Sequence, residues 1–146
     1  MKYTISIEDN PSQPDLNAVE AGLVGYNDSQ AEKENWRPIA VLMRDENGEI
    51  VAGVDGHTHW NWLAISHLWV SEGLRGQGYG RKLMFMVEQE AVKRGCTHAH
   101  LDTFDFQAKP FYEKLGYEVF GTLEDFPPGH ANYYMQKRLE AREGIQ

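Results

Sequence analysis

Residues 71 to 83, SEGLRGQGYGRKL, combine glycines with basic side chains in a pattern that suits the binding of an anion. The segment from 73 to 87 contains no acidic residue, although the whole chain has a net charge of −8. The start of a helix normally favours acids, because its N–H groups are unsatisfied and carry partial positive charge. Here the segment supplies Arg75, Arg81 and Lys82 instead. The stretch therefore predicts amides and cations that hold an anion, most naturally a phosphate.

Other interpretations of this stretch are weaker or less specific. A nucleotide-hydrolase loop needs Lys followed by Ser or Thr after its last glycine, and Arg81-Lys82-Leu83 lacks that pair. The dinucleotide fingerprint spaces its glycines as G-x-G-x-x-G, whereas the third glycine here comes one position early. A glycine-rich turn with solvated cations remains the structural alternative.

The residues around this stretch predict a scaffold of strands and helices. Strands are expected over 3–7, 63–70, 98–104, 117–123 and 131–139, with two more flanking Asn47-Gly48 within 38–60, and helices over 15–27, 80–94 and 106–115. The Asn-Gly turn implies antiparallel pairing, and strands separated by helices imply some parallel pairing. The sequence therefore predicts a mixed α+β sheet.

Composition limits the class of protein. A chain of 146 residues with 41% hydrophobic and 25% charged residues predicts one globular domain over 1–146. No apolar run is long enough to span a membrane, and the N-terminus lacks a signal-peptide core. Cys96 is the only cysteine, so we expect a buried thiol and a reducing, cytoplasmic location. The excess of 22 acidic over 14 basic residues argues against nucleic acid as the main partner.

Two motifs carry a resemblance to a known family. RGQGYG at 75–80 resembles the R/Q-x-x-G-x-G/A signature of the GNAT N-acetyltransferase superfamily, and a strand ending LWV precedes it as in that family. FDFQAKPFYEKLGYEVF at 104–120 resembles the family's later motif, in which a helix carries a tyrosine and leads into G-[FY] and a strand. The resemblance covers roughly residues 39 to 139. It implies a mostly antiparallel sheet of six to seven strands, with a central parallel pair splayed apart and three to four flanking helices.

The resemblance implies acetyl-CoA as co-substrate and assigns residues to it. Backbone amides after the glycine-rich loop would wrap the pyrophosphate, two arginines would add charge, and the preceding strand would pair with the pantetheine arm. The positions expected to bind the cofactor are Leu68, Val70, Arg75, Gly76, Gln77, Gly78, Tyr79, Gly80, Arg81 and Asp105. Asp105 stands where family members often have Asn, and capping of the helix near Gln107 is an equally good interpretation.

The resemblance also suggests how protons move. Tyr112 matches the family tyrosine near the CoA sulfur, and a phenol with a pKa of about 10 can protonate a leaving thiolate. Its spacing with Ala108, Phe111 and Leu115 also fits a core stripe. The strand over 63–70 lacks the glutamate that many relatives use as general base. His67 or His130 could relay the proton instead.

The implied function is transfer of acetyl to a primary amine of a small, cationic acceptor by direct attack in a ternary complex. Glu124, Asp125 and Phe126 are candidates to line the acceptor site. The alternatives are a protein N-terminal or lysine acetyltransferase and a non-catalytic acyl-CoA-binding module. No metal is expected, because the His-x-His pairs at 57–59 and 98–100 lack a clear third ligand. Relatives often dimerise, so a homodimer is one option.

Overall fold

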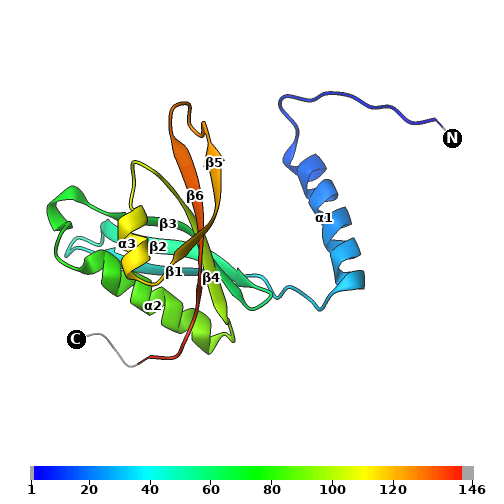
Figure 1. Ribbon diagram of the computed structural model, residues 1–146. Coiled ribbons are helices and arrows are strands. Elements are labelled where there is room, and N and C mark those ends of the chain that lie inside the picture. The colour runs from blue at the N-terminus through cyan, green and yellow to red at the C-terminus, as the bar shows by residue number, and fades with distance from the viewer. Residues whose placement is uncertain (1, 143–146) are drawn as a thin grey trace. The chain divides into compact units, whose positions relative to one another are not determined.

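The computed structural model describes residues 2–142, and the chain divides into two compact units, Met1–Glu34 and Asn35–Gln146. None of the described helices is long and apolar enough to cross a membrane. In chain order the elements are α1 Gln13–Gln30, β1 Arg37–Arg44, β2 Ile50–His59, β3 Trp62–Val70, a 3-10 turn Glu72–Leu74, α2 Tyr79–Lys93, β4 His98–Phe104, α3 Lys109–Lys114, β5 Glu118–Glu124 and β6 Ala131–Arg138 (Figure 1).

The smaller unit consists of an extended segment and α1. Ser12 caps the helix by accepting a hydrogen bond from the Asp15 amide at 3.2 Å, and Pro14 occupies the first turn, where its missing N–H leaves no bond unmade. The helix predicted over 15–27 is thus confirmed, whereas the strand predicted over 3–7 is wrong. A strand is held by hydrogen bonds to a neighbouring strand, and none of the described strand pairings includes residues 3–7.

The larger unit is built on one sheet of six strands in the order β1-β2-β3-β4-β6-β5. Every neighbouring pair is antiparallel except β3 and β4, which are parallel and are connected through α2. The mixed, mostly antiparallel sheet with a central parallel pair is therefore confirmed. Parallel neighbours need a long crossover connection such as α2, because a tight turn joins only antiparallel strands.

The parallel pair separates soon after it begins. β3 and β4 pair only at Trp62 with His98, Leu63 with Ala99 and Ala64 with His100, although β3 continues to Val70. The register between β2 and β3 shifts just beyond this point, between Asp55 and Gly56, which is a β-bulge. Bulges bend a strand and increase its twist, so the bulge accompanies the divergence of β3 from β4.

The core lies between the sheet and the helices α2 and α3 (Figure 1). Met84, Val87 and Ala91 recur along α2 at helical spacing and are fully buried, as are Leu63 and other inward residues of the strands. This burial fixes α2 against the sheet. The start of α2 is thereby held next to the opening between β3 and β4.

The bulge generates a prediction about Gly56. A methyl group built there would collide with the carbonyl oxygen of Ala64 on β3, so Gly56→Ala must displace backbone. We expect a loss of about 1–3 kcal/mol in the free energy of unfolding, measured by urea denaturation. Gly22→Ala is the matched control, because nothing lies within 4 Å of its added methyl group and alanine favours a helix interior. Equal stability of the two variants would contradict this account of the bulge.

Candidate active site

A cleft of about 900 Å³ opens where β3 and β4 diverge. Its walls come from the second half of β3, the loop that precedes α2, the first turn of α2, the end of β4, and α3. Of the residues predicted to bind cofactor or move protons, those that line the cleft are His67, Leu68, Val70, Arg75, Gly76, Gly78, Tyr79, Gly80, Arg81 and Tyr112. Strand divergence therefore brings most of the predicted site to one place.

The glycines of the loop allow its backbone to form one wall of the cleft. Gly76 and Gly78 adopt left-handed conformations, with φ of 75° and 86°, and Gly78 is the N-cap of α2 without a side-chain cap. A methyl group on Gly80 would lie 3.3 Å from the ring of Phe111, so this turn also packs closely on α3. The first turn of α2 holds no acid, and its leading N–H groups have no acceptor within the helix. An anion is the natural acceptor for them.

Arg75 and Arg81, the two arginines predicted to bind the cofactor, make different contacts. Arg75 donates from Nε to the carbonyl oxygen of Val70 at 2.9 Å, which ties the loop to the end of β3. Arg81 lies in the first turn of α2 and lines the cleft. Gln77 does not line it, and its side-chain amide donates to the carbonyl of Gly73 at 3.3 Å. The side chain of Gln77 therefore braces the loop.

Tyr112 is a buried residue whose phenol lines the cleft. Its side chain is only 7% exposed, and its ring packs edge-on against Phe111 and Tyr117. Burial, and secondarily the negative charge of Asp102, raise the pKa of Tyr112 to about 12. The phenol is therefore protonated at neutral pH and can serve as a hydrogen-bond or proton donor. Asp102 was not predicted from the sequence, because only the fold brings it beside α3.

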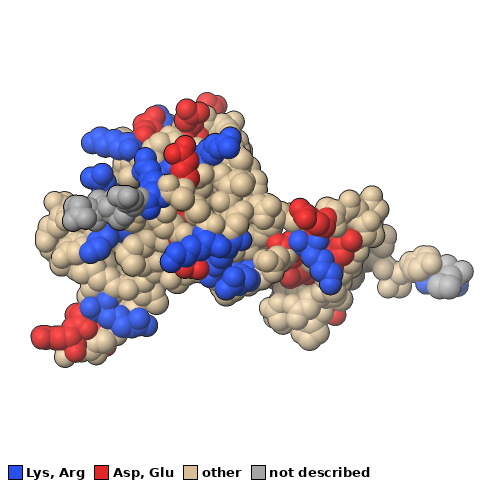
Figure 2. Space-filling model, turned by 90° about the horizontal axis from the view of Figure 1, so that it is seen from below, with Lys and Arg blue, Asp and Glu red and all other residues tan. Residues whose placement is uncertain are grey.

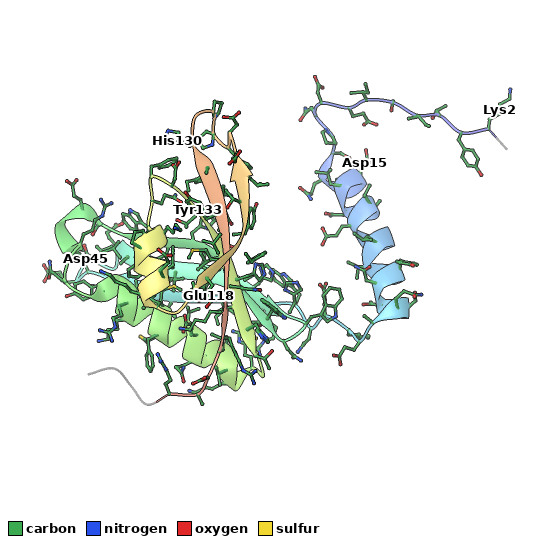
Figure 3. All side chains as sticks on the ribbon, in the orientation of Figure 1. Lys2, Asp15, Asp45, Glu118, His130 and Tyr133 are labelled. Carbon is green, nitrogen blue, oxygen red and sulfur yellow. The ribbon has the colours of Figure 1, made fainter. Side chains whose placement is uncertain are left out.

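His67 and His130 each contact an aspartate. The Nδ1 atom of His67 on β3 lies 3.0 Å from Oδ1 of Asp55 on β2, and His67 lines the cleft. His130 lies at the turn between β5 and β6 (Figure 3), where its Nδ1 atom is 2.8 Å from Oδ1 of Asp105. Neither contact was predicted from the sequence, because Asp55 and Asp105 lie far from their histidines in the chain; Asp105 was predicted only as a cofactor-binding or helix-capping residue.

Asp105 holds a loop in place. Besides contacting His130, it accepts a hydrogen bond at Oδ2 from the amide of Ala131 at 3.0 Å. Neither Asp105 nor His130 lines the cleft, but the His130 ring packs edge-on against Phe106, which does. Both carboxylate oxygens of Asp105 are thus engaged within the protein.

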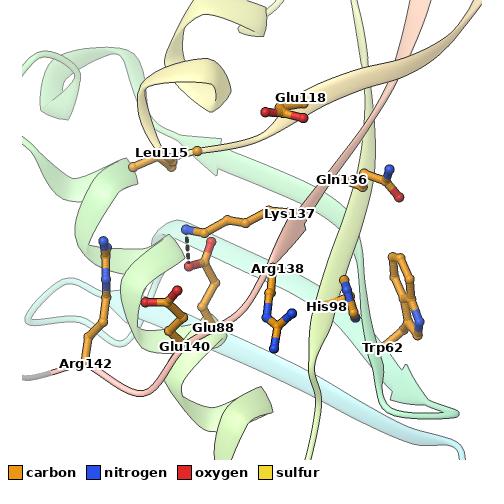
Figure 4. Close-up of a pocket in the computed structure, with 11 residues that line it drawn as sticks. Trp62, Glu88, His98, Leu115, Glu118, Gln136, Lys137, Arg138, Glu140 and Arg142 are labelled. Carbon is orange, nitrogen blue, oxygen red and sulfur yellow. Dashed lines mark hydrogen bonds and ion pairs between the residues drawn. The ribbon is translucent and has the colours of Figure 1, made fainter.

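A second cavity, of about 520 Å³, is lined by charged residues of α2 and β6 (Figure 4). Lys137 contacts Glu88 at 2.7 Å, and the Tyr117 hydroxyl donates to the same carboxylate at 2.8 Å. Burial and the charge of Glu88 raise the pKa of Tyr117 well above its ordinary value. Both carboxylate oxygens of Glu88 are therefore bonded to neighbouring side chains of the protein.

No cluster of three potential metal-ligating side chains occurs within residues 2–142. His57 stacks on Trp36, and His98 stacks on Trp62. In Figure 2, basic side chains on the viewed face of the larger unit lie in separate groups with acidic ones among them.

Comparisons with known proteins agree with this geometry. Residues 10–117 match the family model described as "Acetyltransferase (GNAT) family". The chain belongs to the GNAT acetyltransferase family. It is 39% identical over 107 residues to a blasticidin-S acetyltransferase of Streptomyces morookaense, an alignment that covers 70% of this chain and 79% of that one.

Two further GNAT relatives cover more of the chain. An acetyltransferase of Agrobacterium fabrum is 35% identical over 122 residues, which is 84% of this chain and 89% of that protein. The crystal structure of an acetyltransferase from Bacillus cereus superposes with a TM-score of 0.83 at 33% identity, covering 92% of this chain and 98% of that one. GNAT acetyltransferases use acetyl-CoA. The N–H groups of the first turn of α2, which have no acceptor within the helix, fit a cofactor that carries a diphosphate.

The raised pKa of Tyr112 predicts how stability depends on pH. The folded state disfavours the phenolate, so Tyr112 removes stability as the pH rises from its unfolded pKa of 10 toward its folded pKa of about 12. We expect the urea midpoint of the wild type to fall more steeply above pH 10 than that of Tyr112→Phe. Parallel midpoint curves for the two proteins would show that the phenol is not buried as described.

Proposed function

We propose that this protein transfers an acetyl group from acetyl-CoA to the primary amine of a small, cationic acceptor, by direct attack in a ternary complex. The observation that supports this most strongly is the cleft between β3 and β4, which joins the open amides of α2 to the buried phenol of Tyr112. One end suits a diphosphate and the other suits a leaving thiolate. Membership of the GNAT family supports the same assignment.

The cofactor lies along the diverging strands in this proposal. Amides of Gln77, Gly78, Tyr79 and Gly80 hold the pyrophosphate, and Arg81 adds a positive charge near it. The backbone of Leu68 and Val70 pairs with the pantetheine arm, because β4 no longer occupies that edge of β3. Asp105 is assigned to the loop that carries His130 rather than to the cofactor, since both its oxygens are engaged there.

The chemistry requires two proton movements. The acceptor must lose a proton from its ammonium, and the neutral amine then attacks the thioester carbon to give a tetrahedral intermediate. An amide of the nearby bulge polarises the thioester oxygen. The C–S bond then breaks, and Tyr112 donates to the departing thiolate while a proton from the former ammonium restores the phenol. His67 or His130 receives the remaining proton and passes it to solvent.

The acceptor site is assigned to the open end of the cleft near the turn between β5 and β6. Phe106 lines the cleft and contacts the His130 ring, and Phe104 packs on both Phe106 and Phe126. Glu124 and Asp125, beside Phe126, would attract a cationic acceptor. One relative is named for blasticidin S, which makes that antibiotic the first acceptor to test.

The proposal is tested by measuring CoA release from acetyl-CoA with a panel of acceptors. The panel contains blasticidin S, an aminoglycoside, spermidine, free amino acids and a basic peptide with a free N-terminus. We expect turnover with at least one small cationic amine and a new amide in the product by mass spectrometry. Turnover with the peptide alone would favour a protein acetyltransferase. Tight CoA binding without turnover on any acceptor would favour a binding module.

Replacing the buried phenol separates catalysis from binding. Tyr112→Phe removes the proton donor and keeps the ring packing, so we expect kcat to fall by about 10²- to 10⁴-fold while the Kd for CoA stays unchanged. Tyr134→Phe is a suitable control, because Tyr134 lies on β6 and does not line the cleft. Wild-type turnover in Tyr112→Phe would refute the assigned donor.

A further inference from the structure

The bulge in β3 decides which side chain faces Asp55. Gly56 pairs with Ile65, whereas Asp55 pairs with His67, so Ser66 is the extra residue with no partner on β2. In an unbroken antiparallel ladder, the residue opposite Asp55 would be Ser66. Bulges are known to redirect side chains next to active sites. Here the extra residue places the imidazole of His67 across from the carboxylate of Asp55, with Nδ1 and Oδ1 3.0 Å apart.

This contact contributes little to stability. The side chains of His67 and Asp55 are 81% and 51% exposed, and ion pairs in water contribute only about 0–1 kcal/mol. Its position is more informative than its energy, because His67 lines the same cleft as Tyr112. A carboxylate that accepts a hydrogen bond from Nδ1–H fixes one tautomer of the ring and leaves Nε2 without a proton.

The second aspartate–histidine pair is arranged differently. Asp105 uses one oxygen for His130 and the other for the Ala131 amide, so it fastens the start of β6. His130 lies outside the cleft wall and reaches it only through the ring of Phe106. Both histidines contact a carboxylate through Nδ1, but of the two only His67 lines the cleft.

We propose that His67 is the general base and that Asp55 is its positioning residue, a proposal that rests on the acetyl transfer proposed above. Nε2 of His67 takes a proton from the acceptor ammonium, and the resulting imidazolium is stabilised by the carboxylate of Asp55. The neutral amine attacks, CoA leaves as a thiol, and the imidazolium returns its proton to solvent. Overall, ammonium and acetyl-CoA give the amide, CoA and one proton.

A double-mutant cycle tests the proposal. Acetyl-CoA is the donor, and turnover is measured with two acceptors: blasticidin S and the best acceptor of the panel. His67→Ala should lower kcat about 10²-fold or more without changing the Kd for CoA, and added imidazole should restore part of the rate. Asp55→Ala should lower kcat about 10-fold or more. In the His67→Ala background, Asp55→Ala should cost nothing further, because Asp55 acts only through His67. Equal losses in both backgrounds would overturn the positioning role.

An NMR measurement tests the pair without any acceptor. Nitrogen shifts of the His67 ring should report the Nδ1–H tautomer in the wild type and a change toward Nε2–H in Asp55→Ala. An unchanged tautomer would overturn the proposal. Glu118→Ala, on β5, is the control and should leave both the spectrum and the turnover unaltered. If no amine is acetylated by the wild type, the proposed function fails; if turnover is normal in His67→Ala, only the base assignment fails.

Discussion

The separation of β3 from β4 after three residue pairs is the constraint on which the rest of this protein depends. A sheet that stayed fully paired would leave no edge for a ligand, and its side chains would fill the space. Because the strands diverge, the backbone of β3 from Ile65 to Val70 borders a cleft of about 900 Å³. The bulge at Ser66 and the missing side chain at Gly56 shape β3 where the strands diverge, so the cleft originates in backbone geometry.

The start of α2 supplies the cleft with backbone N–H donors. Buried residues such as Met84 and Val87 fix the helix against the sheet, so its N-terminal amides point to a set position. The acidic chain places no carboxylate in that first turn, which keeps the amides available to an anion. Tyr112 also lines the cleft, and burial raises the pKa of its phenol to about 12. The cleft thus offers backbone N–H donors and a phenol donor, which suits a cofactor that carries phosphates and leaves as a thiolate.

Local signals in the sequence were enough to predict the glycine-rich loop before α2 and most of the scaffold. Glycine spacing located the loop, β4 was predicted with its observed bounds at 98–104, and the Asn47-Gly48 turn is closed by Asp45, whose carboxylate accepts from the amides of Asn47 and Glu49. Interactions set by the fold were not predictable. The contact of Asp55 with His67 depends on a one-residue bulge. The strand expected over 3–7 is absent, and an alternating pattern alone does not say whether another strand pairs with it.

The central claim is that main-chain N–H groups at the start of α2 hold the diphosphate of the cofactor. Amide chemical shifts of the isotopically labelled protein test it most directly, when CoA is compared with pantetheine, which lacks the diphosphate. We expect large shifts at Gln77, Gly78, Tyr79 and Gly80 with CoA and small ones with pantetheine. Equal shifts with both ligands, or none with CoA, would contradict it.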